Sequence, residues 1–292
     1  MVLERQTSWG GGVALYMFLG GTGAGIFAAG FVMVFFSDLK WLTVSALLLG
    51  PLLVGLGLLC LLLEAGTPLQ AFRLFEGLPT SWMSRGGLIQ MLFVLLGLAY
   101  ALPGFWFPGW LSSGAGIVLG GIALLLALAL SIYHGLVLTE SRGIPLWSSG
   151  VLPVLSFFIA LSTGLGLLML ISPVYGQLDG RHEVAPVVGR MAVLGTAFII
   201  GQLISVWSLM SVRPSAVYAE SIRRIRAPLI AGAACLLVAL MLFAGLWTIG
   251  ADFRWVAIIA GVFLLATGFI TRYAILKAGY YIPLRVPVPS SY

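Results

Sequence analysis

The chain has 292 residues, of which 61% are hydrophobic and 8% are charged, and its mean hydropathy is +1.11. So few polar residues cannot coat the surface of a water-soluble protein of this length. The composition therefore excludes a soluble globular enzyme or a nucleic-acid-binding domain and indicates an integral membrane protein.

Eight apolar stretches are long enough to cross a hydrocarbon core of about 30 Å, which takes about 20 helical residues. They predict an all-α membrane protein with transmembrane helices at 13–36, 41–63, 86–107, 114–138, 149–171, 187–210, 228–249 and 255–276. The first stretch exceeds the apolar core of a signal peptide, so we expect it to be retained. The polar interruptions between stretches are too short to fold as separate modules.

An even number of helices places both termini on one side of the membrane, here called the terminal face. Four cations fall on the other side: Lys40, Arg181, Arg190 and Arg254. The remaining cations fall on the terminal face: Arg5, Arg73, Arg85, Arg142, Arg213, Arg223, Arg224, Arg226, Arg272, Lys277 and Arg285. Positive charge is enriched in cytoplasmic loops, which predicts cytoplasmic termini, although a basic face can also dock an acidic partner.

Metal ligation finds little support in the sequence. Cys60 and Cys235 are solitary and lie in apolar segments, where a small hydrophobic side chain is the ordinary interpretation. Of the two histidines, only His134 lies in a predicted membrane segment, which excludes haem ligation by two histidines within this subunit. We expect neither haem nor metal in this chain.

Polar residues at membrane depth are costly and are candidates for function. Tyr133 and His134 lie near the end of segment 114–138, Glu64 ends segment 41–63, Arg85 opens segment 86–107, and Glu140 follows segment 114–138. Helix direction brings all of them toward the terminal face. The first segment begins on that face with Trp9, Tyr16 and the run "LGGTGAG", so a site is expected in that half of the membrane.

Each of these residues also has a purely structural interpretation. Tyr133 is compatible with an aromatic belt at the membrane interface, and His134 with a hydrogen bond between helices. Glu64 and Arg85 are compatible with an ion pair. The glycines of Leu19–Gly25 form part of a small-residue stripe, a pattern more often used for helix packing than for ligand binding. The residues alone leave these alternatives open.

Three segments together resemble a known family. They are "LYMFLGGTGAGIFAAG", "EAGTPLQAFRLFEGLPTSWMSRGG" and, most specifically, "YHGLVLTESRGIPLWSSGVLPVLSFFIALSTG". In order and spacing they resemble the NrfD family of membrane subunits, to which the membrane subunit of polysulfide reductase belongs. The similarity covers the first five predicted helices, and the last three match in number and length.

The resemblance implies two four-helix bundles, at residues 1–140 and 141–276, followed by an extended tail at 277–292. It further implies a subunit of a respiratory oxidoreductase that exchanges electrons with menaquinone or ubiquinone and carries no redox centre of its own. The implied partners are a four-cluster ferredoxin-like iron–sulfur subunit and a molybdopterin catalytic subunit, in anaerobic respiration at a bacterial or archaeal cytoplasmic (inner) membrane. The quinone would lie in the first bundle, with a helix-four tyrosine, here Tyr133, among its hydrogen-bonding groups.

The chemistry of the residues agrees with this placement, because quinone reduction puts negative charge on carbonyl oxygens and requires neutral or cationic donors. Adjacent helix positions point about 100° apart, so we favour Tyr133 over His134 as the direct contact. Some relatives carry Asn or His just before the first helix, whereas this chain has glycine at 10–12, which leaves the second donor unassigned. The candidate quinone-binding residues are Tyr133, His134, Tyr16, Gly20 and Gly21, and the candidate proton-path residues are Glu64, Arg85 and Glu140.

Two other classes of protein compete with this interpretation. A secondary transporter or ion channel would also be all-helical and rich in glycine. Such a protein is expected to carry a charged residue in the middle of its later helices, where its coupling ion would bind. The middles of the four segments from 149–171 to 255–276 contain no charged residue. A purely structural membrane anchor would tether peripheral subunits and would not respond to quinone-site inhibitors.

Overall fold

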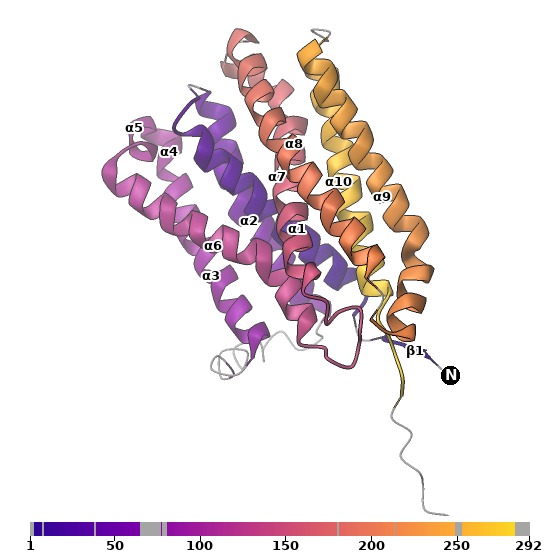
Figure 1. Ribbon diagram of the computed structural model, residues 1–292. Coiled ribbons are helices and arrows are strands. Elements are labelled where there is room, and N and C mark those ends of the chain that lie inside the picture. Colours follow the sequence, from indigo (N-terminus) through magenta and orange to yellow (C-terminus); the bar gives the residue numbers. More distant parts are fainter. Residues whose placement is uncertain are drawn as a thin grey trace, which may run out of the picture.

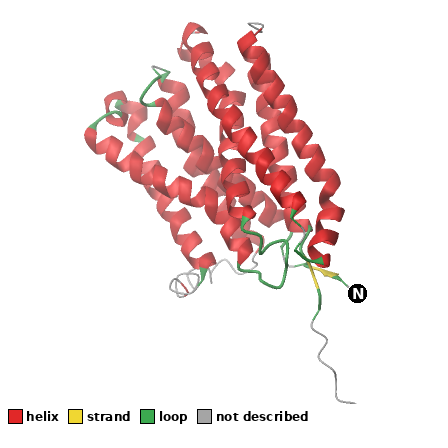
Figure 2. Ribbon diagram, viewed as in Figure 1, coloured by secondary structure: helices red, strands yellow, loops and turns green. Residues whose placement is uncertain are grey.

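The computed structural model describes residues 3–7, 9–37, 39–64, 77, 81–179, 181–212, 214–248 and 253–283. Eight of the described helices are long and apolar enough to span a membrane (Figures 1 and 2). Apart from them, the described chain contains two single-turn helices, α4 (Pro103–Trp106) and α5 (Pro108–Leu111), and two short strands, β1 (Glu4–Arg5) and β2 (Tyr280–Tyr281). The eight long helices are α1 (Gly11–Met33), α2 (Lys40–Glu64), α3 (Trp82–Ala101), α6 (Gly114–Thr139), α7 (Val151–Asp179), α8 (Arg181–Ser211), α9 (Ala216–Thr248) and α10 (Phe253–Lys277). The predicted all-α membrane fold is confirmed.

Three helices run well beyond their predicted ends. Residues 172–190 were expected to be largely a polar interruption, but α7 continues to Asp179 and α8 starts at Arg181. The polar segment between the predicted spans 187–210 and 228–249 contains four arginines, and it is helical from Ala216. Helical hydrogen bonds are local and persist outside the hydrocarbon layer, and Glu220 adds ion pairs to Arg223 and Arg224 one turn away. The apolar run therefore marks the membrane span but not the end of the helix.

Helix α1 occupies the centre of the molecule. In its most apolar 18-residue window 78% of residues are buried, against 28–39% in every other spanning helix of the described chain except α7, which reaches 67%. Small residues make this possible because they let neighbouring backbones approach closely. A Cβ atom at Gly23 would meet α2, and one at Gly25 would meet the carbonyl oxygen of Ala160 on α7.

The helices of each half pack in sequence around α1 and α7. In the first half α1 packs on α2, α2 on α3, α3 on α6 and α6 on α1, and in the second half α7, α8, α9 and α10 are related in the same way. Helix α1 also packs extensively on α7, and α6 packs on α7 too. The buried hydrophobic residues form two clusters, and each cluster takes residues from both halves of the chain. The division into two bundles at residue 140 therefore stays a prediction.

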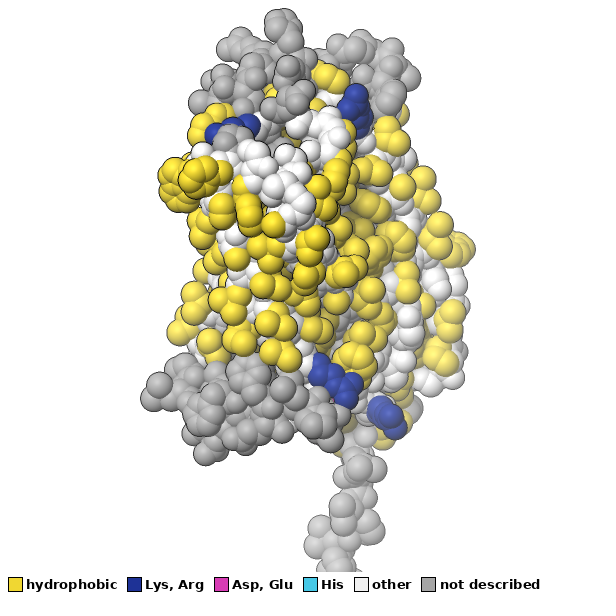
Figure 3. Space-filling model, turned by 90° about the vertical axis from the view of Figure 1, so that its left-hand side faces the viewer, with side chains coloured by type: hydrophobic (Ala, Val, Ile, Leu, Met, Phe, Trp, Pro, Cys, Tyr) yellow, Lys and Arg dark blue, Asp and Glu magenta, His cyan; other side chains and the backbone are white. Residues whose placement is uncertain are grey.

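The outer surface is apolar at the height that a membrane would cover. On the face seen in Figure 3, hydrophobic side chains fill the area between two levels that carry Lys and Arg. The side chains of Leu125, Ile204 and Met241 are more than half exposed. Such exposure is costly in water but not in lipid, which fits a multi-pass membrane protein.

The two ends of the described chain meet on one face. Strand β1 pairs antiparallel with β2, so that Glu4 lies opposite Tyr281. The Gln6 amide nitrogen donates hydrogen bonds to the carbonyl oxygens of Trp9 (3.0 Å) and Leu276 (3.1 Å). The predicted tail therefore starts with the end of α10 and a short strand, and its residues 284–292 lie outside the described part of the chain.

The crossing of α1 and α7 predicts a sharp effect of volume at Gly164. A Cβ atom there would meet the backbone of Gly25 and Ile26, which cannot move aside as a flexible side chain can. Gly164→Ala is expected to destabilise the folded state by about 1–3 kcal/mol, measured as a lower midpoint of thermal unfolding in detergent. Gly121→Ala is the matched control, because a Cβ atom at Gly121 meets nothing within 4 Å. Equal midpoints for the two variants would contradict the close crossing.

Candidate functional site

Two tyrosines and a glutamine form a buried polar cluster between α1, α3 and α6. Tyr133 on α6 is buried and packs against Gly86 of α3, where a Cβ atom would overlap its ring. Its hydroxyl group lies beside that of Tyr16 on α1. Gln90 of α3 donates a hydrogen bond of 2.6 Å to the same Tyr16 hydroxyl. The sequence brings these groups together because glycine at position 86 leaves room for the Tyr133 ring.

His134 lies next to this cluster and is also buried. Its ring packs edge-to-face against Tyr16, with 5.5 Å between ring centroids. A Cβ atom at Gly20 would lie 2.9 Å from the His134 ring, so the absence of a side chain on α1 makes space for the imidazole. Neither ring nitrogen of His134 has a hydrogen-bond partner in the described chain. The imidazole is therefore able to donate or accept a hydrogen bond.

Arg272 of α10 lies in the interior and not on the terminal face, where it was predicted. It was counted among the cations of the terminal face, but it is buried, and its guanidinium group packs against Gly21 of α1. Its Nη1 donates to the carbonyl oxygen of Phe18 at 3.4 Å. The expectation that the later helices carry no charge at membrane depth is therefore wrong. The long arginine side chain extends well away from its own Cα atom, which a count of positions along α10 does not reveal.

The segment that follows His134 connects the two halves of the chain. A Cβ atom at Gly135 would meet the backbone of Leu152 and Pro153, so glycine permits the start of α7 to lie directly against α6. Trp147 is buried, and its indole N–H donates a 2.9 Å hydrogen bond to the carbonyl oxygen of Ile275 on α10. Close packing therefore fixes α6, α7 and α10 around His134.

The predicted proton-path residues lie at the edge of this site rather than inside it. Glu64 is exposed at the end of α2, and its carboxylate occupies the space beside Gly10 and Gly12, where a Cβ atom would meet it. Gly10 and Gly12, two of the glycines that left the second donor unassigned, thus make room for a carboxylate at the start of α1. Gly12 is four residues before Tyr16, so the Glu64 carboxylate lies about one helical turn from Tyr16 along α1, toward the terminal face.

Glu140 and Arg85 each contact Trp82 at the start of α3. The Glu140 carboxylate accepts a 3.1 Å hydrogen bond from the backbone N–H of Trp82, the first residue of α3. A carboxylate at this position satisfies a helix N–H group and is favoured by the helix dipole. Arg85 is partly buried and lies over the Trp82 ring, 5.1 Å from its centroid. A structural role at the α3 terminus therefore accounts for the position of Glu140.

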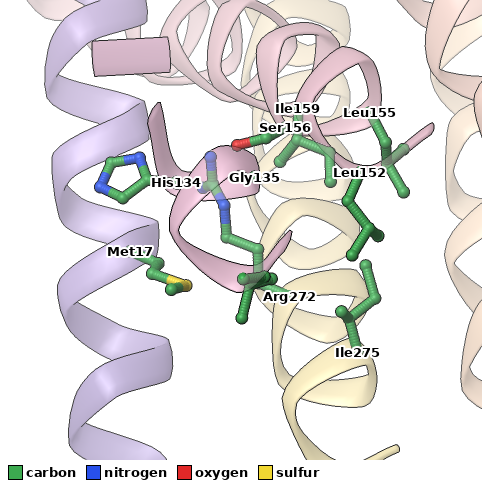
Figure 4. A pocket seen from close by; sticks show the side chains of 10 residues that line it. Met17, His134, Gly135, Leu152, Leu155, Ser156, Ile159, Arg272 and Ile275 are labelled. Atoms are coloured by element: carbon green, nitrogen blue, oxygen red, sulfur yellow. The ribbon is translucent and has the colours of Figure 1, made fainter. Parts of the chain in front are cut away.

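A small cavity lies on the α7 side of His134 (Figure 4). Its volume is about 20 Å³, which is room for about one water molecule, whereas ligand pockets are typically about 300–1,000 Å³. The cavity is therefore too small for a quinone ring. Among the residues that the structure describes, no three His, Cys, Asp or Glu side chains gather as metal ligands would.

Five residues of this region were predicted from the sequence, and three others were not. Tyr133, His134, Tyr16, Gly20 and Gly21 lie together as expected. Gln90, Arg272 and Ser156 were missed, although Gln90 and Arg272 carried a readable signal because each lies within an apolar helical segment. Ser156 carried none, since serine is common at contacts between membrane helices.

The fold and the buried polar cluster define a polytopic membrane protein with hydrogen-bonding groups at hydrocarbon depth. The family model for polysulphide reductase, NrfD, matches residues 2–283, and the chain belongs to this family. Membership implies a membrane subunit of a quinone-interacting oxidoreductase complex, and the family typically pairs with iron–sulfur and molybdopterin subunits. A search of curated proteins gave no match.

The indole hydrogen bond of Trp147 gives a second prediction. Trp147→Phe keeps an aromatic ring but leaves the buried carbonyl of Ile275 without its donor, so we expect a loss of about 1–3 kcal/mol in the free energy of unfolding. Trp207→Phe is the control, because Trp207 is 74% exposed and faces the surroundings. Thermal unfolding in detergent measures both variants, and a stable Trp147→Phe protein would show that the bond does not fix α10.

Proposed function

We propose that the chain exchanges electrons between the membrane quinone pool and a peripheral iron–sulfur subunit, within a complex whose catalytic subunit contains molybdopterin. The observation that supports this most is the pair of buried hydroxyl groups of Tyr16 and Tyr133, with Gln90 and His134 beside them. Membership of the NrfD family supports the quinone as the lipid-soluble carrier, which the residues leave open between menaquinone and ubiquinone.

The donor set suits a quinone head group. Reduction adds two electrons and two protons to a quinone and places negative charge on its carbonyl oxygens on the way. Tyr133 is proposed to donate its O–H to one of these oxygens, since a neutral donor in a dry site stabilises developing negative charge without reorganising. Tyr16, whose hydroxyl group accepts a hydrogen bond from Gln90, lies beside the Tyr133 hydroxyl and is proposed to orient it.

The space available restricts where the head group can enter. The cavity on the His134 side has room for about one water molecule. The Tyr133 ring also fills the space beside Gly86 of α3, so a head group that reaches the tyrosine pair is proposed to displace neighbouring side chains. Gly20 and Gly21 then act indirectly, because they make room for His134 and Arg272.

Protons are proposed to reach the site from the terminal face. Glu64 is exposed there and lies one turn from Tyr16 along α1, so a proton taken up by Glu64 has a short route to the Tyr16 and Tyr133 hydroxyl groups. Glu140 and Arg85 remain further candidates on the same face. The excess of cations on that face favours a cytoplasmic orientation of the termini, in a bacterial or archaeal cytoplasmic membrane.

One observation favours the alternative function of a secondary transporter. Arg272 places a charge at membrane depth in the second half of the chain. Family membership still favours the oxidoreductase. Electron transfer from quinol in the purified complex, with no solute gradient present, separates the two functions. A purely structural anchor would leave that reaction insensitive to every substitution in the tyrosine cluster.

Substitution of Tyr133 tests the proposed contact. Tyr133→Phe removes one hydroxyl donor with little change in volume, and we expect quinol-linked turnover of the assembled complex to fall about 10²-fold, the scale for loss of one oxyanion donor. Turnover with a soluble electron donor that bypasses the membrane is expected to be unchanged, and copurification of the partner subunits reports assembly.

Tyr100→Phe is the matched control. Tyr100 is equally buried, but its hydroxyl bonds to the carbonyl oxygen of Leu111 at 3.1 Å, on the face opposite the termini. Its loss is expected to lower stability and not the quinol-linked rate per assembled complex. Wild-type turnover in Tyr133→Phe would remove Tyr133 from the proposed mechanism.

A further inference from the structure

Arg272 carries a charge to the middle of the membrane. Its guanidinium group packs against Gly21, which is ten residues into α1 and therefore about 15 Å from the start of that helix. Half of a hydrocarbon core of about 30 Å is crossed at that depth. Arginine keeps its proton in proteins, so the charge cannot be lost by titration.

No carboxylate of the described chain balances this charge. The ion pairs found among the described residues join Glu220 to Arg223 and Arg224, at the start of α9. In the sequence, every Asp and Glu lies at or beyond the end of an apolar segment, away from mid-membrane depth. A buried charge left without a counter-charge costs several kcal/mol, so a negative group from outside the chain would be strongly favoured here.

The small cavity lies where such a group would bind. It is lined by polar and apolar side chains from four helices, among them Met17, His134, Ser156, Arg272 and Ile275. Figure 4 shows the guanidinium group of Arg272 directed between His134 and Ser156. Arg272 Nη2, Ser156 Oγ and both nitrogens of His134 are buried and have no hydrogen-bond partner within the described chain. Three unsatisfied groups and a full positive charge thus surround one void.

We propose that this cavity is a binding site for a single small monovalent anion of the halide class, such as chloride. Arg272 donates N–H groups and supplies the charge, Ser156 donates its O–H, and His134 donates one ring N–H. A water molecule would satisfy these hydrogen bonds but would leave the charge in place. Phosphate and sulfate are too large for a space of about 20 Å³.

Anion-dependent stability tests the site. The purified chain is unfolded thermally in detergent while chloride or bromide replaces gluconate at constant ionic strength, and gluconate is too large for the cavity. We expect the midpoint to rise with halide and to saturate, because a ligand that binds the folded state stabilises it by mass action. A midpoint that does not depend on the anion would overturn the proposal.

Two variants and a control assign the effect to the cavity. Arg272→Gln is expected to raise the apparent Kd for bromide at least tenfold, and Ser156→Ala about fivefold, as for the loss of one hydrogen bond. Arg226→Gln removes an exposed cation of α9 and is expected to leave the Kd unchanged. If Arg272→Gln does not fold, the comparison of Ser156→Ala with Arg226→Gln still decides, and equal Kd values in these two variants contradict the proposal.

Bromide also locates the site directly. In crystals of the purified chain grown with bromide, anomalous difference density is expected within hydrogen-bonding distance of Arg272 and Ser156. Density typical of water alone at that position, or bromide bound only elsewhere, would overturn the proposal. Neither experiment uses quinol turnover as its readout, so the anion site and the proposed quinone function can fail independently.

Discussion

Close approach to α1 is the constraint on which the rest of the structure depends. Helix α1 packs on α2, α6, α7 and α10, and the closest of these approaches depend on positions of α1 that carry no side chain. Glycine provides these positions. Gly20 makes room for the His134 ring, and Gly21 makes room for the Arg272 guanidinium group. Gly23 and Gly25 let the backbones of α2 and α7 approach. Packing and polar chemistry therefore share one surface.

The same feature explains why the small-residue stripe and the candidate site were difficult to separate. In many membrane helices such a stripe serves packing alone, and at Gly25 it does. At Gly20 and Gly21 the absent side chains are replaced by an imidazole and a guanidinium group, which remain partly unsatisfied. Polar groups are costly in hydrocarbon, so the space that glycine opens determines where α6 and α10 can place them.

The sequence was informative where the underlying physics is local. Hydrophobic length located the eight spanning helices of the described chain, and the cost of burial singled out Tyr133 and His134. It did not show that α9 starts at Ala216, because hydrogen bonds within a helix continue after the apolar residues end. It also did not show that Gln90 reaches Tyr16 or that Arg272 reaches Gly21, near the opposite end of the chain, because these contacts depend on how distant helices pack.

The burial of α1 also has a consequence for biogenesis. The ribosome completes α1 long before it makes α7 and α10, the helices that later cover Gly25 and Gly21. Its mean hydropathy of 1.6 is the lowest among the eight spanning helices of the described chain, so at the translocon it partitions into lipid less strongly than its successors do. Helix α2, which follows after a short connection and packs on it most extensively, would hold the nascent α1 in the bilayer as a helical hairpin until the second half of the chain is synthesised.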